Sequence, residues 1–404
     1  MVDHDKMPHS RKRHATLVIK TFLKASPLVG VIGQRQTGKT TLCRELAPQW
    51  ASLDRTADLT SCTSSPEAFI AEREPPFLID ECQLCPGLFS ALKAHVFENK
   101  RVGQFLLTGS VRFTSRKIIR ESLTGRILNI ELLPMTYSEC HDRPLPQSLI
   151  GLARHSPAHL PKPTIKLKDP QAWMSYLSTG GLPGICFQRN SKLRATRFKM
   201  HLETLLERDF GLISQSNLPK MTLLAILTIL AKRQGLPLDW TQLRRDTGVS
   251  VITLKKVFAA FDGLFLVRPV LAHDKSTIDT YFFEDQGTAS YLAGFDSAPT
   301  LSDFVRFLYA NLREQLHYQP GLGYQVSSYR TRGGAVVPLV FNFENRSIGI
   351  VAQFESHPTL SAVKSAESFL KQNKNSKVII VTESGDSTKI HDRLYFMPWN
   401  TLVG

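Results

Sequence analysis

The chain has 404 residues, a length that favours two or three domains with sizeable cores. Lysine and arginine outnumber aspartate and glutamate by 15, which favours a polyanionic partner such as nucleic acid or an anionic membrane surface, with merely solvated charges as the alternative. The chain has no apolar run long enough for a transmembrane helix, no signal peptide and no disulfide framework among its six cysteines. We therefore expect a protein of the reducing cytoplasm.

Residues 1–27 begin polar and basic and then become partly apolar. Val18, Ile19 and Phe22 recur at helical spacing, which predicts a short helix packed on the domain that follows. The basic triplet that starts at Arg11 is either a phosphate contact or the solvated start of this helix.

The most informative motif is residues 33–40, which read G-Q-R-Q-T-G-K-T after an apolar stretch and before a predicted helix. This is the P-loop pattern in its strand–loop–helix context. Gly33 and Gly38 permit a tight turn around phosphates, Lys39 is expected to reach the β- and γ-phosphates, and Thr40 to ligate Mg²⁺. The predicted ATP-binding residues are Gly33, Gln36, Thr37, Gly38, Lys39, Thr40 and Thr41.

A second motif lies about 40 residues further on, where the apolar residues 77–79 precede Asp80 and Glu81. This pattern predicts a Walker B strand in which Asp80 holds Mg²⁺ through water and Glu81 acts as general base toward the attacking water. Cys82 and Cys85 follow directly, but no second pair of ligands completes a zinc site, so we interpret them as incidental thiols.

Residues 104–110 read as a buried strand that ends in hydroxyl side chains. Thr108 or Ser110 is a candidate sensor of the γ-phosphate or orienter of water, and a turn that needs Gly109 is the alternative. Arg126 stands just before another predicted strand, where it is either an arginine finger, in the same chain or across a subunit interface, or a surface ion pair.

Five segments together carry a specific resemblance: G-x-R-Q-x-G-K-T-T (33–41), L-I-D-E-x-Q (78–83), F-L-L-T-G-S (105–110), S-L-x-G-R (122–126) and L-x-P-x-x-x-x-E (132–139). In them the chain resembles a group of prokaryotic AAA+-type ATPases that carry a winged helix and a nuclease-like C-terminal module. The resemblance implies an ATP- and Mg²⁺-dependent α/β protein. Members mostly have proline where Gln34 stands, and glutamine there is compatible with nucleotide binding.

The resemblance and the sequence pattern together predict four parts. Residues 1–140 form the P-loop AAA+-type parallel-sheet domain, and the proline-rich residues 141–170 form a linker. Residues 171–275 form a helical and winged-helix domain, whose third helix presents Lys255 and Lys256 but no side chain suited to reading base edges. We expect either phosphate contact without sequence readout or a purely architectural winged helix.

Residues 276–404 resemble the nuclease-like α/β module but lack its chemistry. Such an enzyme needs carboxylates for Mg²⁺ and a nearby lysine, and the corresponding positions hold Pro338 and Gln353, with Ser302 in place of a helical glutamate. A slip of one residue recruits Asp303 and Glu355, but no lysine replaces the missing one. We therefore predict no DNA cleavage.

The sequence favours a slow, Mg²⁺-dependent ATPase coupled to DNA or to a protein partner. The alternative is a nucleotide-gated switch that binds ATP with little hydrolysis and recruits a partner. The predicted catalytic residues are Glu81, Thr108 and Arg126, and the metal ligands are Thr40 and Asp80. The oligomeric state stays open, a homo-oligomer included.

Overall fold

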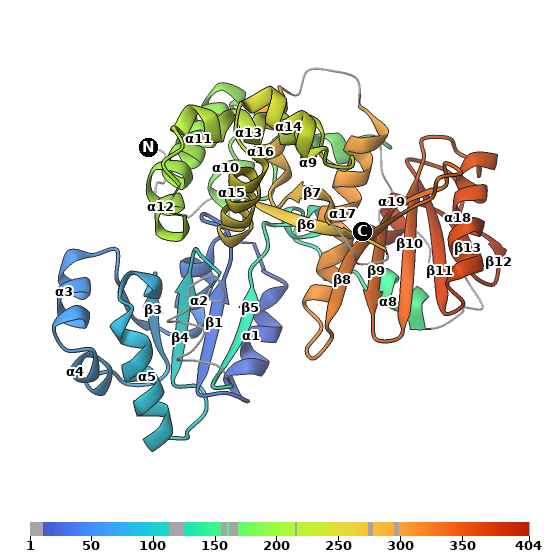
Figure 1. Ribbon diagram of the computed structural model, residues 1–404. Coiled ribbons are helices and arrows are strands. Elements are labelled where there is room, and N and C mark those ends of the chain that lie inside the picture. Colours follow the sequence, from blue (N-terminus) through green and yellow to red (C-terminus); the bar gives the residue numbers. More distant parts are fainter. Residues whose placement is uncertain are drawn as a thin grey trace, which may run out of the picture.

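The computed structural model of the chain shows an α/β protein with two sheets and a helical segment, which lies above the N-terminal sheet and beside the C-terminal one (Figure 1). Among the residues that it describes, no helix is both long and apolar enough to cross a bilayer. The described residues are 11–112, 125–154, 160, 169–214, 216–273, 278–294 and 299–403.

The N-terminal part is a parallel sheet with strand order β2-β3-β4-β1-β5. Its elements are α1 (Ala15–Leu23), β1 (Leu28–Ile32), α2 (Lys39–Leu46), β2 (Gln49–Ser52), α3 (Thr56–Ser64), α4 (Pro66–Ala71), β3 (Phe77–Asp80), the 3₁₀ turn η1 (Cys82–Leu84), α5 (Gly87–Glu98), β4 (Phe105–Gly109) and β5 (Ile127–Glu131). Strand β4 lies between β1 and β3, so three carboxyl ends meet at one edge of the sheet. That edge is where open α/β sheets bind their ligands.

Helices cover both faces of this sheet. On one face Phe69 and Phe89 pack against the strands, and on the other face Ile19 and Leu42 do so. The strands are therefore apolar runs without alternation, as expected for a parallel sheet buried on both sides. The predicted N-terminal helix is confirmed as α1, and the predicted P-loop α/β domain is confirmed by this sheet.

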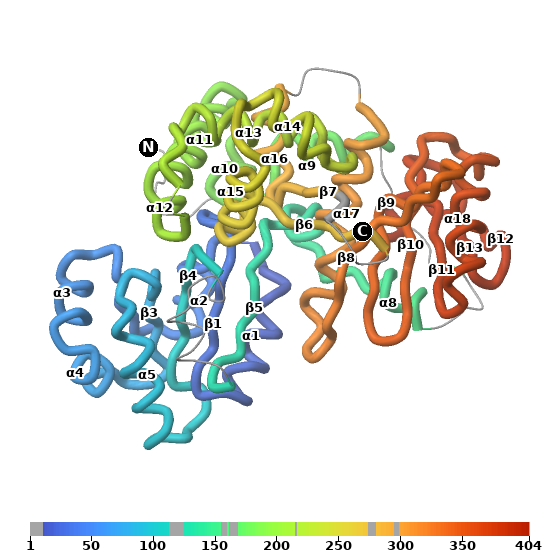
Figure 2. The backbone as a smooth tube through the Cα atoms, viewed as in Figure 1, coloured from blue at the N-terminus to red at the C-terminus, as the bar shows by residue number. Residues whose placement is uncertain are grey.

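A helical segment follows, and Figures 1 and 2 both place its helices α11 and α12 above the N-terminal sheet domain. Its elements are α7 (Tyr137–Cys140), α8 (Ser148–Arg154), α9 (Ala172–Thr179), α10 (Pro183–Cys186), α11 (Ser191–Thr204), the π-helical turn η3 (Leu205–Asp209), α12 (Phe210–Ile213), α13 (Lys220–Lys232), α14 (Trp240–Thr247), α15 (Val251–Gly263) and α16 (Gln286–Ala293). Helix α14 ends at Gly248 with φ of 69°, and Ser250 caps α15 through Thr253 N–H.

The C-terminal part is a mixed sheet with strand order β12-β13-β11-β10-β9-β8-β6-β7. Its elements are β6 (Val267–Ala272), β7 (Ile278–Phe283), α17 (Leu301–His317), β8 (Tyr324–Arg330), β9 (Val336–Phe343), β10 (Arg346–Ala352), α18 (Leu360–Gln372), β11 (Ser376–Thr382), β12 (Thr388–His391), β13 (Leu394–Pro398) and α19 (Trp399–Val403). Phe307 and Leu312 of α17 pack with one face of this sheet, and Phe369 of α18 packs with the other.

Two features of the structure bear on the domain boundaries that the sequence predicts. The boundary between 275 and 276 falls inside the β6–β7 hairpin, and β6 also pairs with β8, so both sides share one sheet. Within the expected linker, Leu149 and Leu152 of α8 are buried in the C-terminal core. The proline-rich centre of that linker, within 161–168, lies outside the described residues.

A chain of buried ion pairs ties the two sheets together. Arg112, which follows β4, lies 3.3 Å from Glu131, and Arg268 of β6 pairs with both Glu131 and Glu284. Glu284 in turn pairs with Arg313 of α17. Burial alone raises the pKa of Glu131, but the charges of Arg268 and Arg112 hold it far below its usual range. A buried charge that loses its partner is costly, so this chain fixes how the parts meet.

Candidate nucleotide site

The loop between β1 and α2 adopts the tight turn that its glycines permit. Gly33 has φ of 152°, and a Cβ atom there would lie 2.5 Å from the carbonyl oxygen of Leu132. Gly38 has φ of 90° and precedes the first residue of α2. Side chains other than glycine rarely adopt these angles, so both glycines are needed to bring the loop back over the end of β1.

The other loop residues divide into inward and outward groups. Thr37 is fully buried and donates its hydroxyl hydrogen to the carbonyl of Gln34 at 2.9 Å. Gln36, with φ of 67°, and Thr41, in the first turn of α2, are exposed. Thr37 therefore shapes the loop, whereas Gln36 and Thr41 are free to face solvent or a ligand.

Lys39 is buried, with 5% of its surface exposed, and its ammonium lies inside the loop. It donates to the carbonyl oxygens of Gly33 and Gln34, both at 2.9 Å. Burial lowers the pKa of Lys39, and the nearby charges of Glu81 and Asp80 oppose that shift. An ammonium held at this position suits phosphate oxygens better than a carbonyl pair, because it gains a full countercharge.

Asp80, at the end of β3, accepts hydrogen bonds from three hydroxyl groups, one in the first turn of α2 and two near the ends of β4 and β2. Its Oδ1 accepts from Thr40 at 2.7 Å and from Thr108 at 2.6 Å, and its Oδ2 accepts from Ser52 at 3.1 Å. Thr40 donates its hydrogen to Asp80, so the lone pairs of its oxygen remain for a cation. Hydroxyl and carboxylate oxygens are the ligands that Mg²⁺ prefers, and the set fits that ion.

Glu81 has φ of 55°, a left-handed conformation that turns its side chain away from the strand direction. Its Oε2 accepts hydrogen bonds from Gln83 and, at 3.1 Å, from Ser110. The amide of Gln83 also donates to Ser110 at 3.2 Å. The side chain predicted to be the general base is thus held in one orientation by two neighbours. The left-handed backbone of Glu81 is strained for a residue other than glycine, and active sites often contain such residues.

Thr108 and Ser110 were expected near the phosphates as alternative sensors, and the structure gives each a different partner. Thr108 bonds to Asp80 and accepts from the backbone N–H of Glu81 at 3.1 Å, whereas Ser110 bonds to the side chain of Glu81. Ser52 and Gln83 were not predicted to have a role. Gln83 stands in the L-I-D-E-x-Q motif, and that position was its only sequence signal.

The helical segment contributes residues that the sequence did not reveal. His201 of α11 lies 3.3 Å from the side-chain nitrogen of Gln34, and Asp209 of η3 lies 3.5 Å from Arg35. Burial, followed by the charge of Arg35, lowers the pKa of His201 to about 3, so this imidazole is neutral. The neighbouring Arg208 pairs with Asp54, which follows β2. The π-helical turn η3 carries Arg208 and Asp209, and such turns are often found at functional sites.

Arg13 is a further residue with an unforeseen role. Its guanidinium donates to the carbonyl oxygens of Thr37 at 2.6 Å and Leu133 at 2.7 Å, and it pairs with Glu139 at 3.1 Å. One member of the N-terminal basic triplet is therefore a buried support of the P-loop. Arg11 and Lys12 are exposed, which both alternatives for the triplet allow.

Arg126 lies at the wrong edge of the sheet for an arginine finger in the same chain. Ile127, its neighbour, pairs with Leu28 at the beginning of β1, whereas the P-loop follows Ile32 at the end of that strand. Five residues of strand separate the two edges by roughly 15 Å. This register disfavours a role within the same chain, and the arginine finger, in the same chain or across a subunit interface, stays a prediction. The rest of the basic stretch, 113–124, lies outside the described residues.

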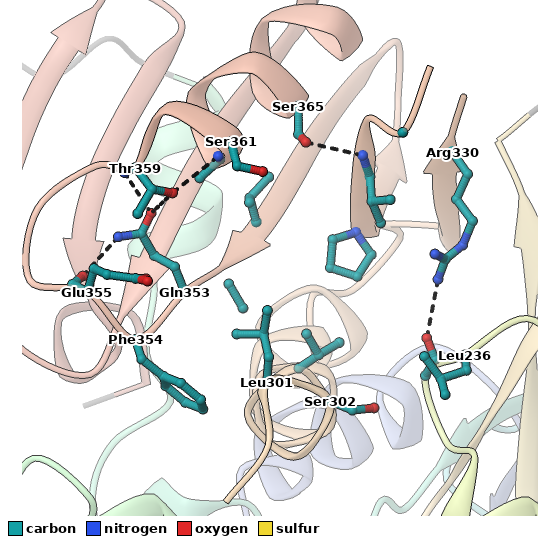
Figure 3. Close-up of a pocket in the computed structure, with 18 residues that line it drawn as sticks. Leu236, Leu301, Ser302, Arg330, Gln353, Phe354, Glu355, Thr359, Ser361 and Ser365 are labelled. Atoms are coloured by element: carbon teal, nitrogen blue, oxygen red, sulfur yellow. Dashed lines mark hydrogen bonds between the residues drawn. The ribbon is translucent and has the colours of Figure 1, made fainter. Parts of the chain in front are cut away.

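The positions compared with a nuclease do converge, on a second site. Ser302, Pro338, Gln353 and Glu355 all line one pocket of about 510 Å³ between α17, β9, β10 and α18 (Figure 3). Gln353 donates to the carbonyls of Glu355 at 2.9 Å and His357 at 2.6 Å, and it accepts from Thr359. The amide is used to hold this loop, as Figure 3 shows.

Cys82 and Cys85 are buried beneath the Walker B strand end. Burial raises the pKa of Cys82 well above its usual range, so this thiol is not reactive. Among the described residues the only cluster with metal-ligand composition is His14, Glu139 and Glu314, which contains no cysteine. The interpretation of Cys82 and Cys85 as incidental thiols stays a prediction.

Comparisons with known proteins support the N-terminal assignment. Residues 25–141 match a family model described as an AAA domain, and residues 170–299 match a domain of unknown function (DUF8612). The chain is 23% identical over 409 residues to the uncharacterized proteins Mb2031c of Mycobacterium bovis and Rv2008c of Mycobacterium tuberculosis, covering 97% of this chain and 84% of each relative.

Among solved structures, the Walker-type ATPase PABY2304 of Pyrococcus abyssi is similar over 69% of this chain and 94% of its own, with 14% identity and a TM-score of 0.41. The winged-helix and nuclease-like interpretations rest on sequence resemblance and stay predictions. The match to the AAA domain, together with the geometry of the loop and the two acids, shows that residues 25–141 contain a P-loop domain of the AAA type.

Proposed function

We propose that the chain binds ATP with Mg²⁺ and hydrolyses it slowly, and that this cycle is coupled to DNA or to a protein partner. The observation that supports the proposal is the continuous hydrogen-bond network from Thr40 through Asp80 and Thr108 to Glu81. It joins the residue expected to hold the metal to the residue expected to handle water, at the sheet edge where the P-loop lies.

Each residue has a defined task in this proposal. Lys39 and the loop N–H groups bind the phosphates, and Thr40 with Asp80 would hold Mg²⁺, which neutralises charge that develops on the phosphates. Glu81 accepts the proton of the attacking water, while Gln83 and Ser110 keep its carboxylate oriented. The rate is expected to be slow because the described part of the chain places Arg126 away from the site, and a completing arginine is worth about 10³–10⁵-fold.

The experiment is ATP turnover by the purified protein, with and without duplex DNA, beside Lys39→Ala and Glu81→Gln. We expect turnover that is lost in both variants, with ATP binding lost only in Lys39→Ala. Turnover that persists in Lys39→Ala would contradict the proposal.

A nucleotide-gated switch is the second candidate function. It is favoured by the contacts Arg35–Asp209 and Gln34–His201, which connect the P-loop directly to the helical segment. A switch predicts that Glu81→Gln binds ATP tightly and stays locked in the partner-binding state. Equal loss of turnover and of partner binding in that variant would instead favour an enzyme whose hydrolysis drives the effect.

A further inference from the structure

The positive charge of the chain is not evenly distributed. Residues 276–404 contain 11 lysines and arginines against 12 aspartates and glutamates, so the whole excess lies in residues 1–275. Between Asp169 and Glu203 the sequence has no acidic residue, and five cations fall within 189–199. The electrostatic footprint of a polyanion-binding protein is a local concentration of this kind.

The structure gathers most of these cations on the outside of α10 and α11. Phe198, His201 and Leu202 of α11 are buried, whereas Lys192 and Lys199 are exposed on one flank of the helix, about 10 Å apart along it. Arg11 joins them from the N-terminal segment, because its guanidinium lies 5.6 Å from the ring of Phe187 beside α10. We call this surface the basic face, and it consists of Arg11, Arg189, Lys192 and Lys199.

None of these four side chains has a carboxylate within 4.0 Å among the described residues, so their charge is not already neutralised. The surface formed by α14 and α15 differs, because Asp246 accepts from Gln242 there and Lys255 lies over the ring of Trp240. Asn190, which follows Arg189, caps α11 by accepting from Leu193 N–H. The face therefore offers mainly positive charge, which suits phosphate groups.

We infer that the basic face binds the phosphodiester backbone of nucleic acid. The buried side of the same helix reaches the P-loop through His201 and Gln34, and its continuation η3 reaches it through Asp209 and Arg35. Binding of nucleic acid to the basic face thus alters the ATP site through these two contacts. This second half rests on the proposed ATPase function, whereas binding itself does not.

The test measures binding of a labelled 30-base-pair duplex to the full chain by fluorescence anisotropy at several salt concentrations. The variant Arg189→Ala/Lys192→Ala/Lys199→Ala removes three exposed charges that make no hydrogen bond among the described residues. The matched control Arg244→Ala/Arg245→Ala/Lys256→Ala removes three exposed charges from α14 and α15. We expect the first variant to bind at least tenfold more weakly at 0.1 M salt, with the slope of log K against log salt reduced by about 2–3, and the control to stay within about twofold.

Further measurements identify which phosphate-bearing molecule binds, and a conservative variant controls for misfolding. Single-stranded RNA and duplex DNA of equal length separate the two nucleic acids, and Lys192→Arg/Lys199→Arg is expected to retain binding. Preference for phosphatidylserine vesicles over nucleic acid, or equal losses in both triple variants, would overturn the inference. Wild-type turnover that rises with DNA, but not in the basic-face variant, supports the coupling. Absence of any turnover contradicts the proposed ATPase function and leaves the anisotropy result to decide the surface.

Discussion

The hydroxyl of Thr108 donates a hydrogen bond of 2.6 Å to Oδ1 of Asp80. The hydroxyl oxygen of Thr108 accepts from the backbone N–H of Glu81 at 3.1 Å, so one side chain on β4 fixes both acidic residues at the end of β3. This is a consequence of strand order, because β4 lies between β1 and β3. Thr108 is therefore a positioning residue for the proposed ATP chemistry, whether or not it touches phosphate.

Replacing Thr108 by valine tests this role with a side chain of similar shape. Thr108→Val leaves the buried N–H of Glu81 without its partner, which costs about 1–3 kcal/mol. If that cost falls on the transition state, kcat drops by about 5- to 150-fold. We expect the Kd of a fluorescent ATP analogue to stay within about threefold and Thr108→Ser to restore kcat. A Thr108→Val enzyme with wild-type kcat would show that the hydroxyl is dispensable.

Arg13 is predicted to stabilise the folded protein around the P-loop. Arg13→Ala removes hydrogen bonds to the carbonyls of Thr37 and Leu133 and leaves the fully buried Glu139 without its guanidinium. Removing one partner of a buried ion pair costs about 3–5 kcal/mol. The midpoint of thermal unfolding should fall sharply, and ATP should recover part of the loss by binding the folded state. The exposed neighbour in Lys12→Ala is the control, and equal midpoints for the two variants would contradict the prediction.

The parts of the site that the sequence predicted are those made by local pattern. Gly33 and Gly38 are fixed by spacing, and Asp80 follows an apolar run that is recognisable as a buried strand. Arg126 shows the limit, because a strand start is visible in sequence but the edge of the sheet at which it lies depends on register with β1. Arg13–Glu139 and Arg35–Asp209 join residues 126 and 174 positions apart, and no local pattern encodes such contacts.

The C-terminal pocket yields a prediction about lost chemistry. Gln353 uses its amide hydrogens on the carbonyls of Glu355 and His357, which a carboxylate cannot do. Gln353→Glu should therefore lower the thermal midpoint and should not create plasmid nicking with Mg²⁺ or Mn²⁺. Glu355→Ala, which alters an exposed side chain, should leave the midpoint unchanged. Nicking by the wild-type protein that disappears in Glu355→Ala would instead reveal a working nuclease.

His14 makes the stability of the protein depend on pH. Burial alone lowers the pKa of His14, but its 3.0 Å contact with Glu314 and the charge of Glu139 raise it to about 9. Because the pKa is higher in the folded state than the usual 6.5, the stabilisation is complete below pH 6.5 and is lost as pH rises toward 9. A difference of this size corresponds to a contribution on the order of 3 kcal/mol.

The measurement is the free energy of unfolding by urea at pH 6, 7.5 and 9 for the wild type, His14→Gln and His357→Gln. The wild type and His357→Gln, whose changed side chain is exposed, should lose stability over this interval, whereas His14→Gln should start lower and change less. Burial and the charge of Glu139 also raise the pKa of Glu314, to about 7, so Glu314 destabilises in the same direction between pH 4.5 and 7. The interval from pH 7.5 to 9 therefore isolates His14, and an unchanged slope in His14→Gln there would contradict the assignment.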